Sequence, residues 1–102
     1  MNLQQLAIDS LGIMRKLDEP MPPSMYTHRA IIYHLHTQGA ATMDTMTQDA
    51  IAIAQNGGMM RRDGKPRTTG GIFFQLAYQA GWERQSYKIK RRLTRWQLQN
   101  DE

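Results

Sequence analysis

The sequence predicts an all-α fold of four to five short helices with one small hairpin-like loop. Apolar residues recur at steps of three and four in several segments, which is the period of an amphipathic helix. Glycine or proline separates these segments. The chain has 102 residues, 40% of them hydrophobic, which suits one domain with a modest core. We therefore expect a single helical domain over 1–102, with an N-terminal helix on a Pro-rich linker (1–19) and a body (24–99).

The first helix is expected over residues 3–17. Its apolar stripe includes Leu3, Leu6, Ile13 and Leu17 at helical spacing. Three prolines in positions 20–23 cannot continue a helix, because proline lacks the backbone donor and clashes with the preceding turn. Two arrangements stay open for this helix: docking on the body, or self-association as a homo-oligomer.

The next helices are placed by their caps. Ser24 is a good N-cap for residues 25–37, which Gly39 would end, and Thr42 would cap residues 43–55. Asp44 would then lie in a first turn, where the helix dipole favours a carboxylate. A fourth helix is expected over 72–80, stopping at Gly81. A fifth should run from position 82 to about position 99.

The connection between the third and fourth helices is the most informative stretch. Asn56-Gly57-Gly58 predicts a helix stop, and Asp63-Gly64 favours a tight turn that closes a hairpin. Four basic residues then crowd a helix N-terminus whose exposed amides favour anions. We predict a phosphate site here, made by Arg61, Arg62, Lys65, Arg67, Thr68, Thr69, Gly70 and Gly71.

The fifth helix carries a second basic pattern. Five cations at three- and four-residue steps lie beside an apolar stripe: Arg84, Lys88, Arg91, Arg92 and Arg95. Mutual repulsion of these charges indicates an anionic partner. Tyr78 and Tyr87 are candidates for stacking on unpaired bases, whereas Phe74 is expected to close the core.

The net charge of +4 is unevenly distributed along the chain. Residues 1–60 hold three basic and five acidic groups, for −2, and residues 61–102 hold ten and four, for +6. A basic half in a chain with a pI near 9.8 is the electrostatic footprint of a polyanion binder. The alternative is a solvated basic face that maintains solubility.

Other function classes find little support. The chain has no cysteine, and His28, His34 and His36 have neither the spacing nor the acidic neighbours of a metal site. We find no catalytic triad and no pair of carboxylates, so we expect no enzyme, metal or cofactor. No apolar run approaches a membrane span, and no signal-peptide pattern begins the sequence. We expect a cytoplasmic protein without a membrane partner.

Residues 55–76 resemble the RNA-binding domain of the phosphorylated adaptor for RNA export (PHAX). The matching elements are Gln55 to Gly58, two methionines, the Asp-Gly turn, the basic residues, and Thr68-Thr69-Gly70-Gly71-Ile72-Phe73. Thr69 replaces the usual proline, and Pro66 interrupts the basic run. The resemblance implies a small helical domain that binds single-stranded RNA with little sequence preference.

Together these observations predict sequence-tolerant binding of single-stranded RNA, with phosphates on the basic residues and a tyrosine stacked on a base. Two alternatives remain from the sequence. One is a small DNA-binding module with the fifth helix in a major groove. The other is a basic protein-interaction adaptor that meets an acidic partner.

Overall fold

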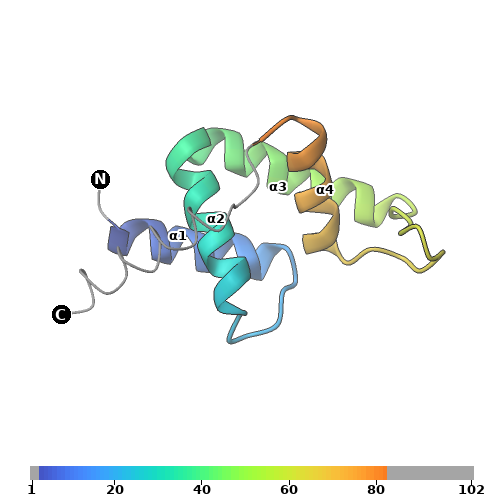
Figure 1. Cartoon of the computed structure of the whole chain (residues 1–102), viewed down its shortest axis with the longest axis horizontal. Helices are drawn as coiled ribbons and strands as arrows, with labels where there is room; N and C mark the ends of the chain where they lie inside the picture. The colour runs from blue at the N-terminus through green and yellow to red at the C-terminus, as the bar shows by residue number, and fades with distance from the viewer. Residues whose placement is uncertain (1–2, 83–102) are drawn as a thin grey trace.

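The computed structural model describes residues 3–82, which form four helices (Figure 1). These are α1 (Leu3–Lys16), α2 (Met25–Gln38), α3 (Ala40–Gln55) and α4 (Thr69–Gln79). The predicted all-α class is confirmed for this part of the chain. Of the predicted fifth helix, only Trp82 falls within the described residues. None of the four helices is both long and apolar enough to span a bilayer.

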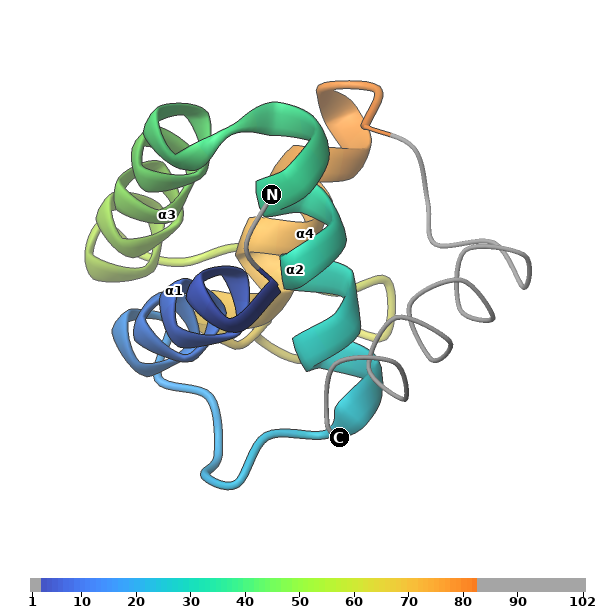
Figure 2. The same ribbon diagram turned by 90° about the vertical axis from the view of Figure 1, so that its left-hand side faces the viewer.

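The helices surround one main core. α1 packs against α2, α3 packs against α4, and further contacts join α3 to α1 and α2 (Figure 2). Each helix contributes a mainly apolar face, because removing apolar surface from water is favourable. The buried members of this core are Ile13, Met14, Leu17, Ile31, Leu35, Met43, Ala50, Ile72 and Phe73.

The apolar face of the N-terminal helix packs against the other helices of the same chain. Its second half enters the main core, while Leu3, Leu6 and Ala7 pack against the buried Ile32 of α2. Buried Ser10 adds a polar contact between these helices: its hydroxyl lies 3.0 Å from Nδ1 of His28. Docking on the body is therefore one use of α1, and self-association through this helix stays a prediction.

The first helix ends at Lys16, four residues before the first proline, so a local cap and not proline ends it. Asp18 takes a left-handed conformation (φ 59°), and the Glu19 amide donates to the Met14 carbonyl at 3.0 Å. This pattern is a Schellman-type cap, which satisfies a carbonyl that would otherwise lack a helical partner. The prolines then carry the chain on without a return to helix.

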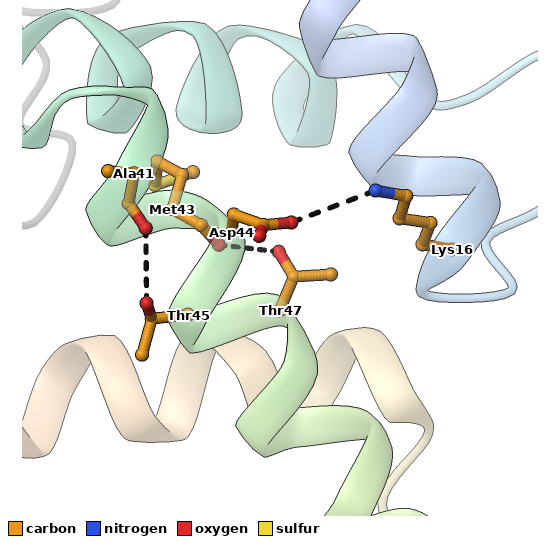
Figure 3. Close-up of polar contacts among 6 residues, drawn as sticks. All are labelled: Lys16, Ala41, Met43, Asp44, Thr45 and Thr47. Atoms are coloured by element: carbon orange, nitrogen blue, oxygen red, sulfur yellow. Dashed lines mark hydrogen bonds and ion pairs between the residues drawn. The ribbon is translucent and has the colours of Figure 1, made fainter.

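The predicted start of α3 is wrong by three residues. Gly39, with φ 88°, ends α2 and begins α3, and its carbonyl accepts from the Met43 amide at 3.1 Å. Thr42 therefore lies within the first turn and is not the cap. Asp44 lies beyond that turn and pairs with Lys16 of α1 across 3.7 Å (Figure 3).

Two threonine hydroxyls of α3 bond back to the helix itself. Thr45 donates to the Ala41 carbonyl at 3.2 Å, and the fully buried Thr47 donates to the Met43 carbonyl at 2.7 Å (Figure 3). The bond at Thr47 explains how a hydroxyl is accommodated among apolar neighbours, since a buried polar group needs a partner.

Candidate nucleic-acid interface

The basic loop begins where α3 ends. Asn56 caps α3, Gly57 has φ 103°, and the Gly58 amide donates to the Ile53 carbonyl at 2.9 Å. This is the glycine-dependent helix stop that the sequence predicts, because a side chain at φ near 100° would be strained. The chain can therefore reverse direction immediately after α3.

A short hairpin-like segment follows, as predicted. The Arg67 amide donates to the Met59 carbonyl and the Arg61 amide to the Lys65 carbonyl, both at 2.8 Å, on either side of a Met60–Pro66 bridge. Residues 60 and 66 form the non-hydrogen-bonded pair of this arrangement. Pro66 is tolerated because its missing N–H is not needed there.

The turn of this segment is a three-residue connection, not a two-residue Asp-Gly turn. The Gly64 amide donates to the Arg61 carbonyl at 3.0 Å, and Asp63 Oδ1 accepts from the Lys65 amide at 3.1 Å. Gly64 has φ 81°, whereas Asp63 is not among the residues with positive φ. The glycine thus takes the left-handed position of a hairpin with a longer loop.

Three cations project from this segment into solvent. Arg61, Arg62 and Lys65 are exposed, and Arg61 Nη2 lies 3.2 Å from Asp63 Oδ2. The pair is open to water on both sides, so it contributes little to stability. It does hold one carboxylate within the cationic group.

The fourth helix begins at Thr69, three residues earlier than predicted, so both glycines lie in its first turn. Thr68 is the N-cap: its Oγ1 accepts from the Gly71 amide at 3.0 Å, and its carbonyl accepts from the Ile72 amide at 2.9 Å. The Gly71 amide is thus already hydrogen-bonded. A phosphate contact through this amide stays a prediction that the geometry does not favour.

Gly70 is buried beneath the linker that follows α1. A β-carbon on this glycine would collide with the Glu19 carboxylate, so with any other residue at this position that side chain would have to move aside. Glu19 places a negative charge at the positive end of α4, where the helix dipole stabilises an anion. This side chain therefore occupies the place where the sequence predicts a phosphate.

A cavity of about 550 Å³ opens between α2, α4 and the chain that follows α4. Its walls are mainly aromatic, with Arg67 at the junction with the hairpin-like segment and Gly71 beside it. We call this cavity the aromatic pocket. Its ring-bearing lining residues are Tyr26, Tyr33, His34, Phe74, Tyr78 and Trp82.

His34 is the centre of this ring cluster. Its ring centroid lies 5.2 Å from that of Trp82, 6.3 Å from that of Phe74 and 6.1 Å from that of Tyr33. Phe73 lies behind them, edge-on to Trp82 at 6.3 Å. Phe74 is half-buried against the core, as predicted, while Tyr78 at the rim is 56% exposed.

Two residues that line the pocket each have a buried polar atom without a hydrogen-bond partner among the described residues. These atoms are Nδ1 of the buried His34 and Nε of the half-buried Arg67. Burial also lowers the pKa of His34 below 6.5, because the charged imidazolium loses solvation. Buried polar atoms normally find a partner, so these two mark an unusual place in the fold.

The structure separates the predicted site residues into groups. Arg67 and Gly71 line the pocket with Tyr78, and Thr68 and Thr69 lie at the start of α4 beside them. Gly70 faces the linker instead. Arg61, Arg62 and Lys65 lie on the hairpin-like segment, exposed to solvent. The remaining predicted contacts lie outside the described residues: Arg84, Tyr87, Lys88, Arg91, Arg92 and Arg95.

The sequence interpretation did not predict that α2 forms one wall of the aromatic pocket. It treated His34 as an ordinary residue and did not consider Tyr26 or Tyr33, although all three face the pocket. A signal for this was present: positions 26, 30, 33 and 34 share one helical face, as do positions 71, 74, 75 and 78. What the spacing could not show is that these two faces meet.

Metal binding finds no support in this part of the chain. Across residues 3–82, no three histidine and acidic side chains gather as a metal-ligand set. His28 is engaged with Ser10, and its pKa is lowered by burial and, secondarily, by the neighbouring Arg29.

Comparison with known proteins identifies a family. No curated protein and no solved structure matches the chain. A family model described as "Phosphorylated adapter RNA export protein, RNA-binding domain" matches residues 11–91, which include α2, α3, α4, the hairpin-like segment and every residue of the aromatic pocket. The match covers most of the chain, and the chain therefore belongs to the RNA-binding domain family of the phosphorylated adapter RNA export proteins.

Proposed function

We propose that this protein binds single-stranded RNA with little sequence preference, through the cations of residues 61–67 and the neighbouring aromatic pocket. Membership of the family indicates RNA binding by a non-enzymatic, adaptor-type domain. The preference for single strands and the tolerance of sequence are our proposal. The observation that carries it is the junction at Arg67, which belongs to both the basic segment and the pocket.

The basic segment suits a phosphate backbone. Arg61, Arg62 and Lys65 are exposed on a segment whose backbone is held by hairpin-type hydrogen bonds, so the three charges lie on one short, ordered stretch of backbone. Contacts to phosphate fix the position of a nucleic acid without reading its sequence. Affinity that rests on such contacts should tolerate many sequences.

The pocket explains why a single strand should be preferred. Aromatic side chains stack on the faces of bases, and those faces are accessible only where bases are unpaired. Tyr78 stands exposed at the rim of the pocket, next to the arginine that ends the basic segment. A duplex could contact the cations but would gain nothing from these rings.

The test is a fluorescence-anisotropy titration with a labelled single-stranded RNA of mixed sequence at several salt concentrations. The variant combines Arg62→Gln and Lys65→Gln, and the control combines Arg15→Gln and Lys16→Gln at the end of α1. For a single strand, each phosphate contact contributes about 0.7 to the slope of log K against log salt. We expect the first pair to reduce the slope by about 1.4 and the control to leave it nearly unchanged.

The same titration separates the alternatives. Equal loss of slope in both variants would mean that net charge, not this segment, governs binding. Stronger competition by duplex DNA of equal length would favour the DNA-binding module. No binding at low salt would favour the protein-interaction adaptor.

A further inference from the structure

We propose that the aromatic pocket receives one unpaired base of the bound RNA and that His34 and Arg67 hydrogen-bond its edge. This inference rests on the proposed function and deepens it. It means that most nucleotides of the bound RNA can carry any base, whereas the protein prefers certain bases at the one nucleotide whose base enters the pocket.

The first argument is the pair of unsatisfied atoms. Nδ1 of His34 and Nε of Arg67 belong to two residues that line the same cavity, and both atoms are buried with no hydrogen-bond partner in residues 3–82, so a ligand reaches them once the two side chains turn toward it. Leaving such atoms unpaired is costly, and a protein normally avoids it. A ligand that supplies both partners would recover that cost on binding.

The chemistry of the two atoms suits a nucleobase better than a phosphate. Arg67 Nε–H can only donate, whereas Nδ1 of a neutral histidine accepts or donates according to its tautomer. Desolvation lowers the pKa of His34, so its imidazole is neutral at pH 7. A base edge carries donors and acceptors side by side, whereas a phosphate oxygen only accepts and would find no charge on the neutral ring of His34.

The walls supply the stacking surface. The cavity of about 550 Å³ is bounded by rings from α2 and α4, with Tyr78 at its rim and Trp82 and Phe74 around His34. Stacking on aromatic rings is available to every base, because each has a π-face. The rings would therefore hold any base, and the two polar atoms would discriminate among bases.

Gly71 provides a second, independent observation. It lies in the first turn of α4, and glycine is a weaker helix former than alanine. A β-carbon there would lie 3.6 Å from Arg67 Cβ and only 3.2 Å from Thr68 Oγ1, the cap oxygen, which would have to shift slightly. The cap therefore accounts in part for glycine at this position. Its place in the pocket wall beside Arg67 keeps that edge open for a ligand.

The experiment uses an RNA-like decamer with a continuous ribose-phosphate backbone and no bases, compared with the same decamer carrying one central base. Because only one base is present, it cannot be replaced in the pocket by a neighbour. We expect the single base to raise the affinity of the full-length protein by about tenfold, the scale of one base–aromatic stack, and we expect the four bases to differ.

Tyr78→Ala is the pocket variant and Met60→Ala the control, since Met60 is exposed in the hairpin-like segment and outside the pocket. We expect the gain from the single base to disappear in the first and to persist in the second. In the wild type, the ¹⁵N resonance of His34 Nδ1 should shift when the base-bearing decamer is added and not with the base-free one.

The outcomes distinguish the two proposals. Equal affinity of the wild type for both decamers, together with salt-sensitive binding of ordinary single-stranded RNA, overturns the base pocket and leaves RNA binding through the cations of residues 61–67 standing. A gain that survives Tyr78→Ala with no shift at His34 also overturns it, because the base then binds elsewhere. Failure to bind ordinary RNA at low salt overturns the proposed function itself.

Discussion

Asp63→Asn should increase RNA affinity, because the carboxylate of Asp63 sits within the group of cations proposed to contact phosphates. Asparagine keeps the Oδ1 atom that accepts from the Lys65 amide at 3.1 Å, so the turn is retained. It removes the partner of Arg61, whose Nη2 lies 3.2 Å from Asp63 Oδ2. Both side chains are about half exposed, so we expect unfolding free energy to change by less than about 1 kcal/mol.

The size of the gain follows from counterion release. If Arg61 becomes free to contact one phosphate, the slope of log K against log salt steepens by about 0.7 for a single strand. With no difference at 1 M salt, that slope gives a gain of about fivefold at 0.1 M. The gain should shrink steadily as salt is added.

Anisotropy titrations with labelled single-stranded RNA at four salt concentrations would measure both quantities. Asp44→Asn is the matched control, because it makes the same change in net charge and also breaks an exposed ion pair, with Lys16 at 3.7 Å (Figure 3). Asp44 lies near the start of α3, eleven residues or about 16 Å of helix from its end. Salt screens most of its influence on the basic segment.

An affinity that is unchanged or lower in Asp63→Asn, with the fold intact, would refute the placement of phosphates on this segment. An equal gain in both variants would attribute the effect to net charge alone. Either result would also remove the support that the segment lends to the base pocket.

Two predictions concern stability. Thr68→Ala removes the side-chain acceptor of the Gly71 amide and should cost about 1 kcal/mol, or about 5 °C in Tm, measured by circular dichroism; an unchanged Tm would contradict the cap. Acidification should destabilise the fold, because burial lowers the pKa values of His28 and His34 below 6.5. The contribution of the two neutral histidines to the free energy of unfolding is complete above pH 6.5. It is lost as pH falls through the lowered folded-state pKa values, so Tm should decrease from pH 7.5 to 5. His34→Gln should make Tm less dependent on pH. A Tm that rises on acidification would contradict the lowered pKa values.

Much of this protein could be predicted from local patterns alone. Helical periodicity, the Ser24 cap and the glycines after α3 and α4 act over a few residues, so they could be identified from the chain itself. The same holds for the hairpin-like segment around Asp63, and for the motif that indicates the family. Errors occurred where two local signals competed, as at α3, where a good capping residue lay inside a turn that Gly39 had already started.

The tertiary structure decided which faces meet. Nothing local to residue 19 predicts that its carboxylate covers Gly70, and nothing local to His34 predicts that it shares a cavity with Arg67. Both contacts join residues more than thirty positions apart, and they depend on how α1, α2 and α4 pack around one core. Side-chain spacing determines which face of a helix is apolar, because that depends only on the sequence of the helix itself. A pocket between helices depends on their relative placement, which the combined packing of all four sets.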